Sequence, residues 1–399
     1  MSGFTTTLSA TDVSKPQARA ARWATSTVFF ANGAVIATWV VRLPGVQQHL
    51  GLSPALVGTA LLGLAVGSLI AMPQTGALAA RYGTRRVTIT AGLMMMLALL
   101  LPFLALNLYT LFAALMVLGG CNGVMDVAMN AQGVAVERSL GQPVMSSFHA
   151  AYSLGNLVGA GLGSLLLGAA LGGLPHALIV TLSMGAALLL AGSRLLPKHA
   201  DEPPKTTETA DTARPTSTPN SLIWLLGALC FMGMLGEGAL GDWSGLYSRD
   251  VLGATGASIG AGYTGFTLAM TLARAFGDGW RSRYGDGRVV TVGALLSGLG
   301  LGLSLLSSTY TLAFVGFLAF GLGVANVVPV LYSAAGSALA GRGIARVATL
   351  GYAGFLVGPP LIGFVSQTAS LVGGMAVIAL SLLLVGLMAP AVYRRMGER

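Results

Sequence analysis

Charged residues are scarce in this chain of 399 residues, where they account for 9% of the composition. A soluble globular protein typically carries about 25%. Hydrophobic residues account for 54%, so water cannot be the main solvent of the folded chain. The composition therefore excludes an ordinary soluble globule.

Two further features are missing from the sequence. It has no G-x-x-x-x-G-K-[ST] motif, which argues against ATP as the driving force. It has only two cysteines, Cys121 and Cys230, both inside apolar runs, where a small buried thiol is favoured over a disulfide or a metal site. We expect a protein that is not an enzyme and that uses no cofactor and no metal.

Long apolar runs are abundant instead. About twelve runs of roughly 20 residues each are long enough to span a bilayer as helices, and many of the 57 glycines within them would let helix backbones approach closely. We predict an all-α membrane protein in the lipid bilayer. The expected spans are 23–43, 55–75, 87–106, 109–132, 144–171, 174–196, 221–247, 258–278, 289–307, 310–338, 346–368 and 370–392.

One stretch between these runs is different. Residues 197–220 are rich in proline, threonine and acids, so they cannot bury a core and are typical of a flexible linker. The linker divides the chain into two halves of six spans. The predicted organisation is a tail 1–22, a bundle 23–196, the linker 197–220, a bundle 221–392 and a tail 393–399.

The basic residues follow one side of this predicted topology. The net charge is +9, but the 22 basic residues are not gathered in one patch, so nucleic acid is not the expected partner. All except Arg42, Arg249 and Arg274 fall in the tails, the linker and alternate loops. The positive-inside rule therefore predicts a multi-pass protein of the inner (cytoplasmic) membrane with both termini and the linker in the cytoplasm.

The two halves repeat each other at a spacing of about 200 residues, as in many transporters. The strongest echo is Arg81-Tyr-Gly83, which recurs as Arg283-Tyr-Gly285. Three more echoes occur in the same order. They pair Asn32-Gly-Ala with Glu237-Gly-Ala, Gly123-Val-Met-Asp126 with Gly323-Val-Ala-Asn326, and Gly155-Asn156-Leu-Val-Gly159 with Gly354-Phe-Leu-Val-Gly358.

The segment Gly76-Ala-Leu-Ala-Ala-Arg81-Tyr-Gly83-Thr-Arg85-Arg86 resembles the loop signature of the major facilitator superfamily. The resemblance implies twelve helices in two pseudo-symmetric six-helix bundles, a small-molecule substrate, and a cytoplasmic gate at this loop. Ala80 replaces the usual acid of the signature. We assign the gate to Gly76, Arg81, Gly83, Arg85, Arg86 and Arg283, together with an expected pair of Arg274 and Asp278.

Within that superfamily the chain is more similar to the YbjJ-type bacterial permeases, through Phe148-His149-x-x-Tyr152 and Glu237-Gly-x-x-x-Asp242-Trp243. It resembles fucose permease more distantly, through Met125-Asp126-x-x-x-Asn130. Val40 stands where fucose permease carries an acid on its first helix. The first resemblance implies no known substrate.

Asp126 is the strongest candidate for proton coupling, because lipid strongly disfavours a charge in the middle of a span. Asn122, Asp126 and Asn130 lie at i, i+4 and i+8, on one face of the fourth predicted helix. The asparagines are candidate substrate ligands. The alternative is a carboxyl group that only bridges helices.

His149 is the second candidate. It shares a face of the fifth predicted helix with Tyr152 and Asn156, and it should lie at a similar depth to Asp126. We expect His149 and Asp126 to form a proton-carrying pair, with Tyr152 and Asn156 near the substrate. A histidine satisfied by the backbone or a headgroup is equally consistent with the sequence.

The resemblance further implies that the first, fourth, seventh and tenth helices line a central cavity. These helices carry Asn32, Asp126, Glu237 and Asn326. Glu237 would be a second proton carrier or a substrate ligand on a glycine-rich helix that bends as a gate, although close packing is an alternative reason for the glycines. Asn32 and Asn326 would bind substrate.

Other polar residues favour simpler interpretations. Trp39 and Trp243 lie near the outer ends of their helices and are expected in the aromatic belt. Asp242, Arg42 and Arg249 are expected at the periplasmic rim, in contact with water or with one another.

Together these features predict a monomeric secondary active transporter that moves a small sugar-like or other polar solute by alternating access. Isolated carboxyl groups and a histidine favour a proton over sodium as the coupling ion. One alternative is a drug or metabolite antiporter working as an exporter. Another is a membrane sensor that does not transport. The sequence determines neither the substrate nor the direction of transport.

Overall fold

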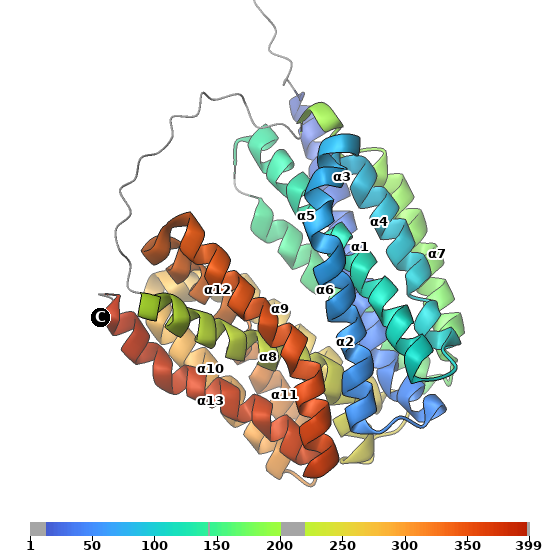
Figure 1. The fold of residues 1–399 in the computed structure, drawn as a ribbon, viewed down its shortest axis with the longest axis vertical. Helices are drawn as coiled ribbons and strands as arrows, with labels where there is room; N and C mark the ends of the chain where they lie inside the picture. Colours follow the sequence, from blue (N-terminus) through green and yellow to red (C-terminus); the bar gives the residue numbers. More distant parts are fainter. Residues whose placement is uncertain (1–12, 143, 201–219, 397–399) are drawn as a thin grey trace, which may run out of the picture.

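The computed structural model describes residues 13–142, 144–200 and 220–396, without the side chains at positions 146, 199, 220, 278, 336–345 and 348. Most of the predicted linker therefore lies outside the described residues. The described chain is nearly all helical, with thirteen α-helices and three short 3₁₀ helices (Figure 1).

The first half contains seven α-helices in chain order. They are α1 (Lys15–Leu50), α2 (Pro54–Ala71), η1 (Met72–Gln74), α3 (Thr75–Tyr82), α4 (Thr84–Ala98), η2 (Leu101–Leu104), α5 (Leu108–Leu140), α6 (Met145–Gly168) and α7 (Gly173–Gly192), followed by η3 (Lys198–Ala200).

The second half contains the other six. They are α8 (Asn220–Asp250), α9 (Ser258–Tyr284), α10 (Asp286–Leu306), α11 (Tyr310–Val324), α12 (Val327–Thr368) and α13 (Leu371–Arg395). Eleven stretches of the described chain are long and apolar enough to cross a membrane. They include Tyr310–Ala335, which joins α11 to the start of α12, and Thr349–Thr368, the end of α12. The helix α9 is less apolar because it contains several glycines and threonines and Arg274. The eleven stretches and α9 together account for the twelve predicted spans.

The predicted boundaries need correction at several helix ends. The first helix starts at Lys15 rather than residue 23, because Ser14 caps it and a proline occupies its first turn. The fourth predicted span continues to Leu140, where Gly141 ends α5 in the left-handed conformation, with φ 65°. Prolines at 73 and 102 convert the ends of the second and third spans into 3₁₀ turns.

The tenth predicted span is interrupted near its middle. α11 ends at Val324 and α12 begins at Val327. Pro329 explains the break, since its ring would clash with the carbonyl of Ala325 four residues earlier in a continuous helix. The carbonyl of Ala325 is thereby free to accept a hydrogen bond from outside its own helix.

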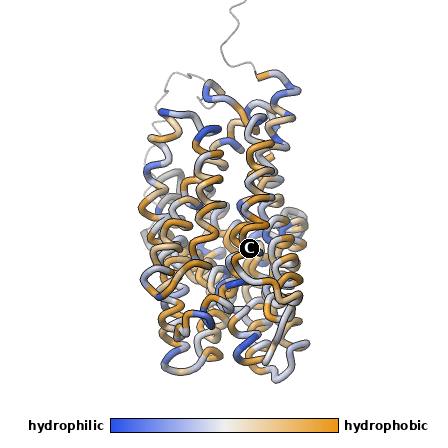
Figure 2. Tube along the Cα trace, turned by 90° about the vertical axis from the view of Figure 1, so that its right-hand side faces the viewer, coloured by the Kyte–Doolittle hydropathy of each residue, from blue (hydrophilic) through white to orange (hydrophobic). Residues whose placement is uncertain are grey.

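The two halves meet at one end of the molecule. We call it the joined end; the α1–α2, α6–α7 and α8–α9 connections lie there. The opposite end, with η3 and the start of α8, is the linker end. Figure 1 shows the first half (blue to green) and the second half (yellow to red) side by side at the joined end and apart toward the linker end. In Figure 2, apolar residues follow the helices and hydrophilic ones occupy many of the turns.

Glycines allow the helices to approach at the joined end. A side chain at Gly58 of α2 would meet the carbonyl oxygen of Pro359 on α12 at 2.7 Å, and one at Gly363 of α12 would meet that of Pro54 at 2.6 Å. Backbone therefore lies directly on backbone where the halves touch.

Candidate functional site

The centre of the site is an ion pair within the second half. Glu237 of α8 accepts a hydrogen bond from Arg274 of α9, with 3.0 Å between oxygen and nitrogen. Both side chains are mostly buried, with exposed fractions of 20% and 28%. A pair at this depth is costly to separate because either charge alone would remain in a medium of low dielectric constant.

Arg274 makes two more contacts, so it is the hub of this cluster. Its Nε donates to the Ala325 carbonyl that Pro329 leaves free, at 3.3 Å. That carbonyl lies at the C-terminus of α11, where the helix dipole favours a cation. The other terminal nitrogen of Arg274, Nη1, donates to Ser153 Oγ on α6, at 3.3 Å. The hub therefore connects α8, α9 and α11 of the second half to the first half.

The predicted gate pair of Arg274 with Asp278 stays a prediction, because the Asp278 side chain lies outside the described residues. The ion-pair partner that the structure shows for Arg274 is Glu237 on the neighbouring helix α8. The spacing of four residues did not reveal Glu237, because it considers only partners on the same helix. Asn326, beside this hub, donates to the Ala273 carbonyl at 3.1 Å.

Asp126 lies on α5 in the first half. Its hydrogen bonds are local: the amide nitrogen of Asn130 donates to the Asp126 carboxylate at 3.2 Å and to the Asp126 backbone carbonyl at 2.8 Å. No hydrogen bond joins Asp126 to His149 within the described part of the chain. The His149 ring instead packs edge-on against Phe29, with centroids 5.3 Å apart.

Two of the asparagines predicted to bind substrate, Asn32 and Asn122, contact each other. Asn32 of α1 donates to Asn122 Oδ1 of α5 at 2.9 Å, and its exposed fraction is 2%. The sulfur atoms of Met95 and Met125 lie 3.5 Å from the same amide nitrogen. In this conformation Asn32 connects helices.

A row of polar contacts between α6 and α9 joins the halves. Tyr263 donates to Asn156 Oδ1 at 3.0 Å, and the hydroxyls of Ser164 and Thr264 are 3.2 Å apart. Tyr152 lies one turn before Asn156 and is partly buried. Asn156 was predicted to lie near the substrate. Its partner Tyr263 was not identified, because a tyrosine near the start of an apolar run carries no distinctive sequence signal.

The predictions for the outer ends of the helices were mostly wrong. Trp39 and Trp243 are 1% and 0% exposed, so neither lies in an aromatic belt facing lipid. Arg42, at 5% exposed, donates to His176 Nδ1 at 3.0 Å and to the Leu171 carbonyl at 2.7 Å instead of meeting water. Both results have the same cause: these side chains lie on helix faces that pack against other helices. The position of a residue along its helix does not reveal which face it occupies.

Arg249 has a different role from the one expected at the rim. It pairs with Asp250 and donates to the Pro44 carbonyl and to Gln47 Oε1, both on α1. It therefore connects α8 to α1 at the joined end. Asp242 is partly buried on α8 and has no hydrogen bond or ion pair within the described residues.

The residues of the loop signature lie together at the linker end. Gly83 has φ 84°, a conformation that favours glycine, and so makes the tight turn between α3 and α4. Arg81 stacks over the Tyr82 ring, 5.1 Å from its centroid, and Arg283 does the same over Tyr284 at 5.4 Å. The repeat seen in the sequence is thus also a repeat in structure. Gly76, Arg85 and Arg86 belong to the same hairpin.

The two related halves have six membrane spans each, since α2 and α3 form one span, Pro54–Tyr82. With polar side chains between them, they define a multi-pass membrane protein of the transporter class. A sequence profile of the Major Facilitator Superfamily matches residues 24–263. The chain belongs to the major facilitator superfamily, as the sequence resemblance implied.

Related proteins extend over nearly the full length. An uncharacterised transporter of this superfamily from Yersinia pestis is 37% identical, covering 93% of this chain and 95% of its own. The membrane protein MosC of Rhizobium meliloti is 32% identical, covering 86% and 83%. The finer resemblance to YbjJ-type and fucose permeases stays a prediction.

Solved structures share the fold at low identity. A mutant of the nucleoside transporter NupG has a TM-score of 0.74 at 13% identity, covering 93% of this chain and 99% of its own. The human organic anion transporter MFSD10 has a TM-score of 0.65 at 18% identity, covering 94% and 100%. A bacterial homologue of the lysosomal transporter Spinster, inward-facing and unoccupied, has a TM-score of 0.67 at 15% identity, covering 96% and 97%.

Proposed function

We propose that this protein is a proton-coupled secondary active transporter that moves a small polar solute by alternating access, with Asp126 as the proton carrier. One observation carries the proposal: within the described residues Asp126 and Asp242 have no cationic partner, whereas Glu237 has one. A carboxylate inside a membrane protein must be paired or protonated. Asp126 has only an amide beside it, so a proton is its simplest source of neutrality.

The Glu237–Arg274 pair supplies the link between binding and movement. Arg274 holds α8 and α9 while also reaching Ser153 in the other half. A solute that hydrogen-bonds to Glu237 or Arg274 would compete with those contacts and change the relative free energies of the two arrangements of the halves. Glu237 thereby acts as a substrate ligand or second proton carrier.

The direction of opening follows from the charge pattern. If the basic linker end lies in the cytoplasm of a bacterial inner membrane, the halves separate on the cytoplasmic side and this is an inward-facing conformation. Its likeness to the inward-facing Spinster homologue supports that assignment. We propose a monomer, since each chain contains both halves.

The polar lining favours a solute with several hydrogen-bonding groups, such as a sugar. A nucleoside has the same kind of groups, and one structural neighbour transports nucleosides. Amides, hydroxyls and an arginine–glutamate pair suit hydroxyl-rich ligands better than apolar ones.

The test uses liposomes that hold the purified protein and a pH-sensitive dye. Sugars, nucleosides, organic acids and cationic drugs are added outside, one class at a time, after a thermal-shift screen for binding. We expect one class to change the internal pH. Asp126→Asn keeps the shape of the neutral carboxyl and should bind that solute without moving protons. Proton-coupled uptake by Asp126→Asn at the wild-type rate would rule out Asp126 as the carrier.

A further inference from the structure

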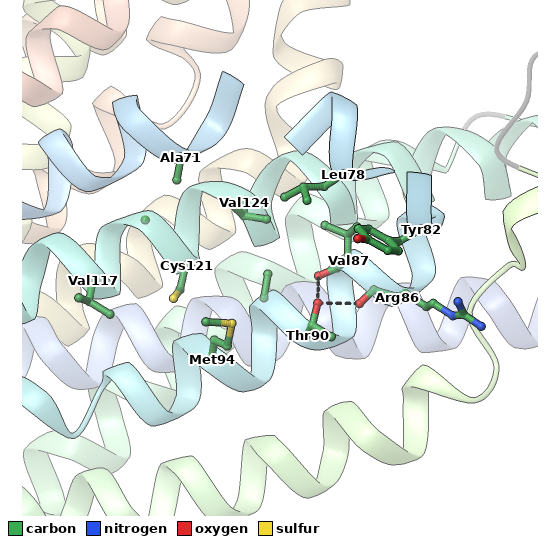
Figure 3. Close-up of a pocket in the computed structure, with 12 residues that line it drawn as sticks. Ala71, Leu78, Tyr82, Arg86, Val87, Thr90, Met94, Val117, Cys121 and Val124 are labelled. Atoms are coloured by element: carbon green, nitrogen blue, oxygen red, sulfur yellow. Dashed lines mark hydrogen bonds between the residues drawn. The ribbon is translucent and has the colours of Figure 1, made fainter. Parts of the chain in front are cut away.

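A groove of about 530 Å³ lies on the first half, between the α2–α3 segment, α4 and α5. In Figure 3 the side chains of Met94, Val117, Cys121 and Val124 line its length, and Tyr82 and Arg86 lie toward its linker end. Its volume is typical of sites that bind small ligands, which span roughly 300–1,000 Å³. All of its lining residues belong to the first half, so it is separate from the site between the halves.

The groove is apolar and faces outward. Met94 is 59% exposed and Val117 is 46% exposed. The hydroxyl of Thr90, within the groove, donates to the backbone carbonyls of Arg86 and Val87 (dashed in Figure 3), so it is already satisfied. Exposed apolar side chains on membrane-spanning helices contact lipid tails, and hydrocarbon is therefore the natural content of this groove.

The length of the groove matches one leaflet. Arg86 and Met94 are eight residues apart on α4, or about 12 Å along the helix axis. Half of the hydrocarbon core of a bilayer is about 15 Å thick. An acyl chain lying along the groove would therefore bring its headgroup close to Arg86.

Four basic residues gather at this end of the groove. Arg81, Arg85, Arg86 and Lys198 lie around the α3–α4 hairpin, and none of them forms an ion pair within the part of the chain that the structure describes. Lys198 is held there by its hydrogen bond to the Arg81 carbonyl, at 3.1 Å.

The equivalent hairpin of the second half, between α9 and α10, contains an ion pair. Asp286 in the α9–α10 turn accepts from Arg281 at 2.8 Å and 3.0 Å. The repeat aligns Asp286 with Thr84, which cannot neutralise a cation. Within the described residues, the α3–α4 hairpin beside the groove therefore carries more unpaired positive charge than the α9–α10 hairpin, where Arg283 and Arg288 remain without an ion pair.

We propose that the groove binds one anionic phospholipid, with an acyl chain along α4 and α5 and its phosphate on the guanidinium of Arg86. The apolar wall selects hydrocarbon, and the uncompensated arginines select a negative headgroup. The proposal does not depend on the transported solute or on proton coupling.

Native mass spectrometry of the purified protein, titrated with phosphatidylglycerol or with phosphatidylcholine of the same chains, tests it. We expect phosphatidylglycerol to bind more tightly. Arg86→Gln should weaken its binding about fivefold, the factor that corresponds to roughly 1 kcal/mol per basic residue at a membrane surface. The matched control is Arg288→Gln, which removes the same charge at the aligned position of the second half and should leave the affinity unchanged.

A second variant tests the acyl chain separately. Cys121 points into the groove in Figure 3, so Cys121→Phe should fill the groove and reduce phosphatidylglycerol binding while all arginines remain. Equal binding of both lipids, equal effects of Arg86→Gln and Arg288→Gln, or unchanged binding by folded Cys121→Phe would each overturn the proposal. So would a dimer that covers the groove. If Cys121→Phe does not fold, the headgroup and arginine comparisons still decide the matter.

Discussion

Replacing Gly159 by alanine should loosen the contact between α1 and α6, the two helices that carry Asn32 and Asn156. A Cβ atom at Gly159 would lie 2.7 Å from the carbonyl oxygen of Ala34, 0.7 Å short of the 3.4 Å at which ordinary contact begins. The obstacle is backbone rather than a flexible side chain, so the helices must separate. Overpacking of this kind costs about 1–3 kcal/mol.

Alanine also has a higher helix propensity than glycine, by about 1 kcal/mol, and this gain would hide part of the clash. Gly161→Ala on the same helix is the matched control, because its Cβ would lie 3.8 Å from the nearest atom, the Thr264 methyl group. The propensity gain cancels between the two variants. The difference in stability between them, about 1–3 kcal/mol, then measures the packing alone.

The assay is thermal unfolding of both variants in the same detergent. At about 2 °C per kcal/mol for a large chain, Gly159→Ala should unfold roughly 2–6 °C below Gly161→Ala. Equal unfolding temperatures would show that α1 and α6 are not in backbone contact at this point.

The other predictions concern the topology, the linker, the joined end and the candidate substrate ligand Asn326. Membrane-impermeant labelling of single cysteines should find both termini and the linker in the cytoplasm, because the basic residues cluster there; labelling of the linker from outside would contradict this. Removing several residues between positions 203 and 219 should leave folding and transport nearly unchanged, since the segment has no apolar face, and a large loss of folded protein would show that it packs on the bundle. Arg249→Ala removes the hydrogen bonds of α8 to α1 and should at least double thiol labelling of a cysteine placed at Ala257, with Arg249→Lys as the intermediate case; unchanged labelling would show that Arg249 does not hold the joined end closed. Asn326→Ala should weaken solute binding while leaving the pH dependence of transport intact, because an amide does not titrate; a lost pH dependence would contradict its assigned role.

The sequence was sufficient to predict the number of spans, because each span is a long apolar run. It was also sufficient to predict two related halves, because the halves repeat the same short motifs. It was insufficient for the partner of Arg274. Which way a side chain points depends on the rotation of α9 about its axis, and no local spacing encodes that. The cross-helix pair with Glu237 appears only when α8 and α9 are placed side by side.

The same limit explains Trp39 and Trp243. Their place near helix ends is typical of an interface with headgroups, but both side chains face other helices and are buried. The tenth span, 310–338, was predicted without its break, although the sequence contains a local signal for one. Pro329 makes a continuous helix unfavourable there, yet which group would use the freed carbonyl of Ala325 was known only from the structure.

That break gives the two halves unequal stiffness although they share one repeat. In the first half α5 is one continuous helix from Leu108 to Leu140 that includes Asp126, so the whole helix moves as one rigid element. In the second half the aligned segment is interrupted at Ala325 and Asn326, which form a joint between α11 and α12. Arg274 donates a hydrogen bond to the Ala325 carbonyl at this joint. Asn326 also holds this joint to α9 through its hydrogen bond to the Ala273 carbonyl, so the joint becomes free only when both contacts are broken. The ends of α11 and α12 can then tilt independently, and the second half can change shape before the first half moves as a body.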